Sequence, residues 1–186
     1  MTEEINKAIA ILEEGGLILY PTDTVWAIGC DTTNELAIQK LYHLKQLNHG
    51  DPMVCLVAHD GMLEKYVEKI PELAYDLMDV NSKPTTIVYD NPTGISKNLT
   101  APDGSVAVRV ASDKFCRYLI NKFKKPIAAT TANSKGNRTP KSFKEIDAAI
   151  LKGVDYVVNL QQENERSQLS TIIKLGSDHK VKVVRE

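Results

Sequence analysis

Cysteine is scarce in this chain of 186 residues, which contains three, and histidine is nearly as scarce, with four. Cys30, Cys55 and Cys116 are widely spaced, and each lies in or beside an apolar run. An odd number of cysteines without a C-x-x-C pair argues against a disulfide framework, and histidines without an H-E-x-x-H pattern argue against a zinc site. We therefore expect three buried, reduced thiols rather than metal ligands or a nucleophile.

Long apolar runs are also missing. No stretch of about 18 apolar residues could cross a membrane, and the acidic start Met1–Glu4 lacks an apolar core of signal-peptide length. We therefore expect a cytoplasmic protein without membrane contact. With 42% hydrophobic and 25% charged residues the chain does not have a disordered composition. Its length suits one globular domain, residues 1–186.

Three common motifs of nucleotide binding and acyl transfer are absent as well. The sequence contains no G-x-x-x-x-G-K-[ST] phosphate loop, no G-x-G-x-x-G after a strand and no G-x-S-x-G turn. If the protein binds a phosphate, the binding groups must therefore be Lys and Arg side chains, hydroxyls and loop amides.

Apolar residues recur with helical spacing in six segments and form short apolar runs in nine others. Several expected strands follow one another without an intervening helix, which favours an α/β domain with a mixed sheet over a parallel doubly wound one. Asp60 is expected to cap the third helix, and Ser142 with Glu145 forms a capping box for the sixth. Helices are expected over 4–14, 34–47, 61–67, 72–80, 113–123 and 143–151, and strands over 17–20, 25–30, 53–58, 85–89, 106–111, 126–129, 154–159, 170–175 and 180–184.

The formal net charge of −1 hides an uneven distribution along the chain. Residues 114–144 carry nine Lys or Arg and no Asp or Glu, whereas residues 1–113 carry eight basic and 17 acidic residues. One interpretation of residues 114–144 is a solvated helix face followed by a lysine-rich loop. The other is an anion-facing segment whose positive charges gather around one cleft. The near-neutral total argues against nucleic-acid binding through the whole surface.

Hydroxyl, amide and cationic side chains lie near the ends of the expected strands, where ligands bind in open α/β sheets. Arg109 lies within an apolar strand, where a charge needs a partner or a polar cleft. Simpler interpretations are a hydroxyl turn for Thr22 and Thr24, a helix-dipole contact for Lys45 and a structural ion pair for Arg109. The candidates are Thr22, Thr24, Lys45, Arg109, Thr130, Thr131, Asn133, Ser170, Thr171 and Arg185.

Taken together, four stretches of the sequence resemble the YrdC-like family, the threonylcarbamoyl-adenylate synthases. The first stretch is the most specific of the four, and the others are persuasive jointly. They follow the family's order over nearly the whole chain. The stretches are YPTDTVWAIGCDTTN at 20–34, LYHLKQLNHGDPM at 41–53, VAVRV at 106–110 with ATTANSKG at 129–136, and LSTIIKL at 169–175 with VVRE at 183–186.

The resemblance implies a single YrdC-like domain with one twisted, open, mixed sheet flanked by helices and a positively charged cleft. It implies a nucleotidyltransferase that converts ATP, L-threonine and bicarbonate into threonylcarbamoyl-AMP and diphosphate. That product serves the N6-threonylcarbamoyl modification of adenosine 37 in tRNA, so tRNA-modification proteins are the implied partners. Mg²⁺ would enter with ATP and be held mainly by its phosphates. The family is also associated with binding of double-stranded RNA.

The resemblance also assigns roles to residues. Thr24, Arg109 and Ser170 would hold threonine or its carbamate, and Lys45 and Arg109 would carry the catalytic charges. The residues that would contact ATP are Lys45, Ser105, Thr131, Asn133 and Arg185.

The chain departs from the family pattern at Leu47, which stands where the K-x-R element has its arginine, and at Leu56, where some members have a histidine. Leucine cannot make a bidentate phosphate contact. Either another cation, Lys135 or Arg138, compensates, or the chain is a paralogue of altered activity that acts as a double-stranded RNA or tRNA-binding module. A third possibility is a metabolite-binding domain.

Overall fold

A computed structural model describes residues 1–48, 50–51, 53–80, 83–176 and 180–185. Within these residues nine strands form one sheet, in the order β7-β1-β2-β6-β3-β5-β4-β8-β9. The strands are β1 Ile18–Pro21, β2 Trp26–Asp31, β3 Val54–Val57, β4 Thr85–Tyr89, β5 Val106–Val110, β6 Ile127–Thr131, β7 Tyr156–Val157, β8 Thr171–Leu175 and β9 Val181–Arg185.

The sheet is mixed, as expected. β3 with β5, β4 with β8 and β1 with β7 pair in parallel, and the other five pairs are antiparallel. The hairpin of β1 and β2 places Tyr20 opposite Ala27, so residues 22–25 form its turn. β2 continues the antiparallel pairing to β6, where Ala27 lies opposite Thr131. The candidate residues of the first and third family stretches therefore meet at one end of these strands.

The long helices pack on this sheet through their apolar faces. They are α1 Thr2–Glu13, α2 Glu35–Lys45, α4 Glu72–Val80 and α5 Lys114–Phe123, and α1 contacts α5 while α2 contacts β2. The side chain of Asn34 accepts a hydrogen bond from the backbone N–H of Ala37 at 3.1 Å and so caps α2. The Asp113 carboxylate caps α5 in the same way, through the N–H of Cys116 at 2.9 Å. Short polar side chains at the predicted helix starts thus satisfy the free N–H groups.

Two expected helices are shorter than the sequence indicated. α3 covers only Asp60–Leu63, and its cap is His59, whose Nδ1 accepts from the N–H of Met62 at 3.2 Å, rather than Asp60. The expected helix 143–151 is divided into a 3₁₀ turn, η2 Phe143–Glu145, and α6 Ala148–Gly153. Ser142 makes no side-chain cap, so the capping box was wrong. Ile146 interrupts the helix because it takes an extended conformation that buries its side chain in the core.

The three cysteines are free and buried, which confirms the expectation from their sequence context. Burial raises the pKa of the Cys55 thiol to about 12, so this side chain behaves as a small apolar group. Across the described ranges, no helix combines the length and the apolar character that a membrane span requires.

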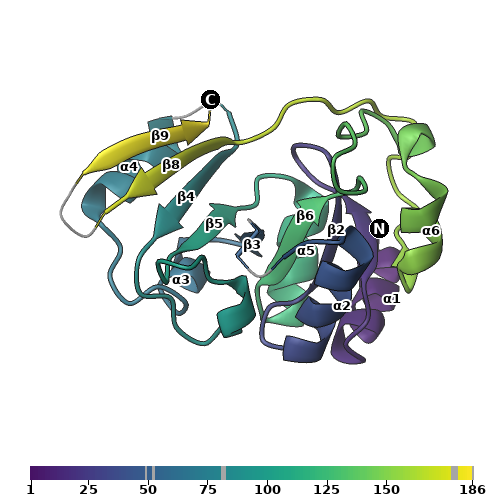
Figure 1. Ribbon diagram of the computed structural model, residues 1–186, viewed down its shortest axis with the longest axis horizontal. Coiled ribbons are helices and arrows are strands. Elements are labelled where there is room, and N and C mark those ends of the chain that lie inside the picture. The colour runs from purple at the N-terminus through teal and green to yellow at the C-terminus, as the bar shows by residue number, and fades with distance from the viewer. Residues whose placement is uncertain (49, 52, 81–82, 177–179, 186) are drawn as a thin grey trace.

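After β7 the chain does not return directly to the sheet. Figure 1 shows the connection from α6 and β7 to β8 passing along the top of the molecule, from one end of the sheet towards the other. Because β1 and β7 lie near one end of the sheet and β8 and β9 at the other, residues 158–170 must cross the central strands. This connection brings Leu169 and Ser170 towards the turn between β1 and β2.

We predict that Gly29→Ala destabilises the fold by about 1–3 kcal/mol, the usual range for overpacking a core. A Cβ atom at Gly29 in β2 would lie 2.5 Å from the carbonyl oxygen of Ala128 and 2.8 Å from the ring of Tyr20. The carbonyl oxygen cannot move away without disturbing the pairing of β2 with β6. Urea denaturation measures the change. Gly61→Ala is the matched control, since its Cβ would be 3.4 Å from its nearest neighbour. Equal stability of the two variants would contradict the packing argument.

Candidate functional site

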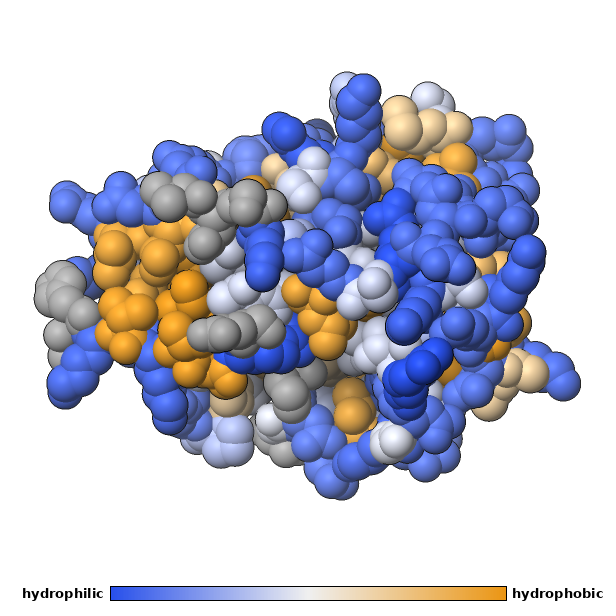
Figure 2. Space-filling view, turned by 90° about the horizontal axis from the view of Figure 1, so that it is seen from above, coloured by the Kyte–Doolittle hydropathy of each residue, from blue (hydrophilic) through white to orange (hydrophobic). Residues whose placement is uncertain are grey.

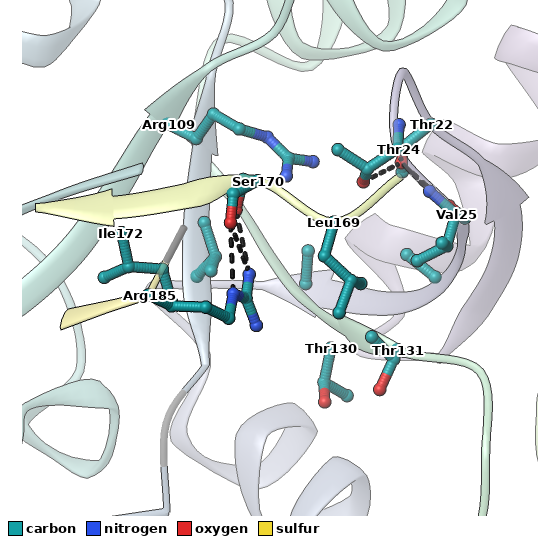
Figure 3. A pocket seen from close by; sticks show the side chains of 13 residues that line it. Thr22, Thr24, Val25, Arg109, Thr130, Thr131, Leu169, Ser170, Ile172 and Arg185 are labelled. Atoms are coloured by element: carbon teal, nitrogen blue, oxygen red, sulfur yellow. Dashed lines mark hydrogen bonds between the residues drawn. The ribbon is translucent and has the colours of Figure 1, made fainter. Parts of the chain in front are cut away.

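A cavity of about 240 Å³ lies where the β1–β2 turn, the central strands and the start of β8 meet (Figure 3). Its walls come from segments that are far apart in the sequence. The residues that line it are Thr22, Thr24, Val25, Ala27, Val54, Arg109, Ala129, Thr130, Thr131, Leu169, Ser170, Ile172 and Arg185.

Small side chains make room for the cavity. Ala27 of β2 and Ala129 of β6 both line it, and Ala129 lies opposite Val54 of β3 in the sheet. Larger side chains at these positions would fill the space above the strands. The sheet therefore supplies an apolar floor, and the polar groups come from its rim.

The β1–β2 turn is organised by Thr22. Its hydroxyl oxygen accepts from the N–H groups of Thr24 at 3.0 Å and Val25 at 3.2 Å, and the hydroxyl donates to the carbonyl oxygen of Val25 at 2.7 Å. The hydroxyls of Thr22 and Thr24 are 2.9 Å apart. Since Thr22 uses its proton on Val25, Thr24 must donate in this pair, and the free lone pairs of Thr24 are left as acceptors for a ligand. The hydroxyl-turn interpretation thus holds for Thr22, and both threonines line the cavity.

Arg109 is both an ion-pair partner and a cavity residue. Its Nη2 lies 3.1 Å from Oδ1 of Asp23, and the two side chains are 7% and 8% exposed. The other carboxylate oxygen of Asp23 accepts from the hydroxyl of Ser112 at 2.7 Å. The pair holds the guanidinium of Arg109 at the edge of the cavity, on the same side as Thr24 (Figure 3). The two sequence interpretations of Arg109 are therefore compatible.

Arg185 enters the cavity from the other side of Ser170 (Figure 3). Its Nε and Nη2 donate to the carbonyl oxygen of Ser170 at 3.1 and 2.8 Å, and Nη2 also donates to the Ser170 hydroxyl at 3.1 Å. The Ser170 hydroxyl is 2.8 Å from that of Thr86. Burial and the positive charge of Arg109 lower the pKa of Arg185. Among the described lining residues, the charged side chains are these two arginines, without a carboxylate.

Lys45, Thr131 and Asn133 form a second polar group beside the cavity. The buried Nζ of Lys45 donates to the carbonyl oxygen of Thr131 at 2.6 Å, to that of Asn133 and to Asn133 Oδ1 at 3.0 Å. The Thr131 hydroxyl donates to Asn133 Oδ1 at 2.5 Å. Burial lowers the pKa of Lys45 to about 8. Lys45 therefore holds the loop after β6 rather than only the end of its own helix, and Thr131 connects this group to the cavity.

Two residues to which the family pattern draws attention lie apart from the cavity: Ser105, directly before the third stretch, and Leu47 of the second. Ser105, expected at the nucleotide, is absent from the described lining, and its hydroxyl donates to Asp103 at 2.6 Å. Leu47 packs against the core and borders a separate hollow of about 210 Å³ with Tyr42 and Asn98.

The two cations considered as replacements for the missing arginine occupy different places. Lys135 pairs with Asp51 at 3.1 Å, in the loop that follows α2. Arg138 points to Glu145 at 3.5 Å and is 73% exposed. Of the two candidate replacement cations, Lys135 is therefore the one that lies beside the end of α2.

The nine cations of residues 114–144 lie outside the described lining of this cavity, which favours the other interpretation of that segment. Five lie on α5 and the turn after it, and four lie in the loop beyond β6, at the opposite end of that strand. Some are paired at the surface, such as Lys125 with Asp31 and Lys144 with Glu163. A solvated helix face and a lysine-rich loop describe them better.

Sequence reasoning missed several residues of the site. Asp23 was available as the carboxylate between Thr22 and Thr24. Thr86 and Arg166 had no local signal, because Thr86 lies in an apolar strand and Arg166 in a polar connection. Their importance comes from contacts to Ser170 and to the carbonyl oxygen of Thr22.

The sequence is similar to a known protein family and to curated proteins of that family. A family model for Sua5, YciO and YrdC, described as "Telomere recombination", matches residues 10–186. A threonylcarbamoyl-AMP synthase of Pseudoalteromonas translucida is 32% identical over 160 residues, which cover 83% of this chain and 84% of that protein. A threonylcarbamoyl-AMP synthase of Psychromonas ingrahamii is 30% identical over 178 residues, 94% of this chain and 84% of that protein.

Solved structures show the same architecture. E. coli YciO has a TM-score of 0.86 at 25% identity, over 100% of this chain and 90% of that one. P. abyssi Sua5 complexed with L-threonine has a TM-score of 0.80 at 25% identity, over 92% of this chain and 50% of that one. This chain therefore spans about half the length of Sua5. The family match over nearly all residues, the synthase relatives and the shared fold show that the chain belongs to the Sua5/YciO/YrdC family.

Proposed function

We propose that the protein is a threonylcarbamoyl-AMP synthase, a nucleotidyltransferase that forms threonylcarbamoyl-AMP and diphosphate from ATP, L-threonine and bicarbonate. The observation that carries the proposal is that Arg109 and Arg185 line the same cavity. The other described residues that line it include several with hydroxyl groups and none with a carboxylate. The relatives named threonylcarbamoyl-AMP synthase and the Sua5 complex with L-threonine support it.

The charges of the cavity suit the carbamate of threonine. This compound carries a carboxylate and a carbamate, and two guanidiniums that repel each other are stabilised by such a dianion. Asp23 neutralises one of the guanidiniums, so Arg185 has the greater need of an anion. The lone pairs of Thr24 can accept from the hydroxyl or N–H of the substrate. We therefore place the threonine moiety between Thr24, Arg109 and Ser170.

The cavity is smaller than the roughly 300–1,000 Å³ of pockets that hold drug-sized ligands, and it suits an amino-acid derivative better than a whole nucleotide. The nucleotide would then extend past Thr131 towards Lys45 and Asn133, with Arg185 near its phosphates. Ser105 directly precedes β5, whose Ala107 lies opposite Val54 of β3. We propose that Ser105 contacts the nucleotide from this position. Mg²⁺ would enter with the ATP phosphates, whose charge it offsets.

In the proposed reaction a carbamate oxygen attacks the α-phosphorus, and diphosphate leaves as the phosphorus–oxygen bond to it breaks. The attacking group belongs to the substrate, so the chain needs to supply no nucleophile. Arg109, Arg185 and Lys45 would hold two anions in contact and stabilise the charge that develops on the phosphoryl oxygens. The product would pass to tRNA-modification proteins for the modification of adenosine 37, in the cytoplasm.

The RNA-binding alternative remains a prediction. It rests on the positive charge of residues 114–144 and on Leu47. Five of those nine cations lie on α5 and the turn after it, and four follow β6. RNA affinity that falls steeply with added salt would support it.

We predict that Arg109→Ala and Arg185→Ala each lower kcat/KM about 10- to 100-fold, because a hydrogen bond to a charged group contributes about 1.5–3 kcal/mol. The assay is release of diphosphate that requires both threonine and bicarbonate. Lys152→Ala, at an exposed position of α6, is the matched control. Absence of threonine- and bicarbonate-dependent release from the folded, unaltered protein would refute the proposed function.

We predict that ATP binding takes up a proton near pH 8 and weakens by up to about tenfold between pH 7 and pH 9. The pKa of Lys45 is about 8 in the free protein, below its ordinary value of 10.5, so the side chain loses its charge over this range. Phosphate oxygens would favour the protonated amine. Calorimetry in buffers of different ionisation enthalpy detects the proton. In Lys45→Arg the uptake should vanish, since arginine does not titrate here; an unchanged uptake would assign the proton to another group.

We predict that Lys135→Ala raises the KM for ATP about tenfold, as expected for loss of one charge-assisted phosphate contact, while Arg138→Ala leaves it unchanged. Lys135 lies beside the loop after α2, in the region where Leu47 cannot supply a charge, whereas Arg138 points to Glu145. Steady-state kinetics at saturating threonine separate the two variants. The opposite ranking would make Arg138 the compensating cation.

A further inference from the structure

Residues 161–168, which we name the crossing segment, pass over the cavity end of the β1–β2 hairpin. Glu163, Asn164, Glu165, Ser167 and Gln168 are all exposed. Figure 2 looks down on this side of the molecule, and its middle and right parts are mainly hydrophilic, while apolar surface gathers at the end that holds β8 and β9. Residues 161–168, QQENERSQ, contain no apolar side chain, so the crossing segment has no apolar packing of its own to hold it in place.

One residue of the crossing segment turns inward. Arg166 is half-buried between exposed neighbours, and its guanidinium donates to the carbonyl oxygen of Thr22 and to Oε1 of Gln161. Its backbone N–H donates to the carbonyl oxygen of Lys141 at 2.6 Å. The ion pair of Glu163 with Lys144 is 3.3 Å long, but both side chains are more than three-quarters exposed, so it contributes little. Arg166 is thus the main side-chain anchor of the segment.

The anchor joins two walls of the cavity. Thr22 organises the turn that carries Thr24, and the crossing segment leads directly into Leu169 and Ser170. An open hollow of about 590 Å³ lies between the segment and the turn, lined by Asp23, Thr24 and residues 163–168. Because Thr24 lines both this hollow and the cavity, the crossing segment stands at an opening of the cavity.

The closed position of Arg166 is not fully satisfied. Its Nε and the Oδ2 atom of Asp113 are buried without a hydrogen-bond partner. Buried polar atoms of this kind oppose the stabilisation that the other hydrogen bonds provide. The guanidinium also binds a neutral carbonyl oxygen at Thr22 rather than a carboxylate. Burial raises the pKa of the nearby Asp113 carboxyl, and the positive charge of Arg166 acts in the opposite direction and lowers it. Release therefore gives up this attraction but breaks no direct ion pair among the described residues.

We propose that Arg166 is a positioning residue: its contact with Thr22 holds the crossing segment against the β1–β2 turn and so completes the threonine side of the cavity. Release of this contact opens the cavity through the hollow, and substrate in the cavity favours the closed position. The role of substrate rests on the function proposed above; the contact and its release do not.

Limited proteolysis of the full chain with a glutamyl endopeptidase tests the contact directly, since Glu163 and Glu165 lie in the segment. Arg166→Ala should speed cleavage at these two sites about tenfold, because proteolysis follows the population of the open form. Threonine, bicarbonate and ATP together should slow cleavage in the unaltered protein. Arg138→Ala, in the neighbouring loop, is the matched control. Unchanged cleavage at Glu163 and Glu165 would overturn the proposal.

Kinetics distinguish positioning from general stability. Arg166→Ala should raise the KM for threonine about tenfold and leave that for ATP within about twofold, and Arg166→Lys should recover part of the loss. Equal changes in both KM values would overturn a role on the threonine side. If Arg166→Ala is cleaved at every glutamate, Arg166→Met takes its place, since methionine keeps much of the side-chain length but has no donor for Thr22. An absence of selective cleavage at Glu163 and Glu165 in Arg166→Met would overturn the contact. Selective cleavage without any diphosphate synthesis would retain the anchor and reject the proposed function.

Discussion

Burial of cations governs how this chain assembles its site. A guanidinium or ammonium group taken out of water must find acceptors, and here each acceptor belongs to a different segment. Arg109 of β5 pairs with Asp23 in the β1–β2 turn, Lys45 at the end of α2 bonds the carbonyl groups after β6, and Arg185 of β9 bonds Ser170. The first two contacts join elements that are not neighbours in the sheet, whereas the third reinforces the paired strands β8 and β9 at the edge of the cavity.

The choice of acceptors also determines what the site can bind. Carbonyl and hydroxyl oxygens satisfy the donors of Lys45 and Arg185 without neutralising their charge, and only Arg109 has a carboxylate partner. The positive charge is thus retained in a partly dehydrated place, where it acts strongly on an anion. Small residues on β2 and β6 leave the space that such an anion needs. Geometry and charge therefore favour the same class of ligand.

Leu47, which stands where the family's K-x-R element has an arginine, shows that this chain keeps only part of the family pattern. The leucine packs against the core and borders its own hollow, so the position has become structural. Lys45, two residues earlier, keeps its contacts to Thr131 and Asn133. The loop cation Lys135 lies beside the same helix end, where it pairs with Asp51. In a binding surface built from several loops, a cation from one loop can replace a cation from another. The electrostatic field at the ligand depends on where the charge lies in space and not on its place in the sequence.

The sequence by itself determined the features that depend on neighbours along the chain. Apolar spacing predicted the positions of the nine strands and of the six helices, although α3 is shorter than expected and the last helix is divided. Thr24, Arg109, Thr131, Ser170 and Arg185 were identified and meet in one cavity. Periodicity acts over a few residues, so it can be seen in the sequence. The two expected caps, Asp60 and Ser142, were wrong because the helix starts depend on tertiary packing as well.

Tertiary structure alone decided the rest. The core burial of Ile146 ended the expected helix, and the run of β6 separated the nine cations into two groups. The contact of Arg166 with Thr22 joins residues 144 positions apart. Such contacts depend on strand order and on the path of a connection across the sheet, which local spacing does not encode.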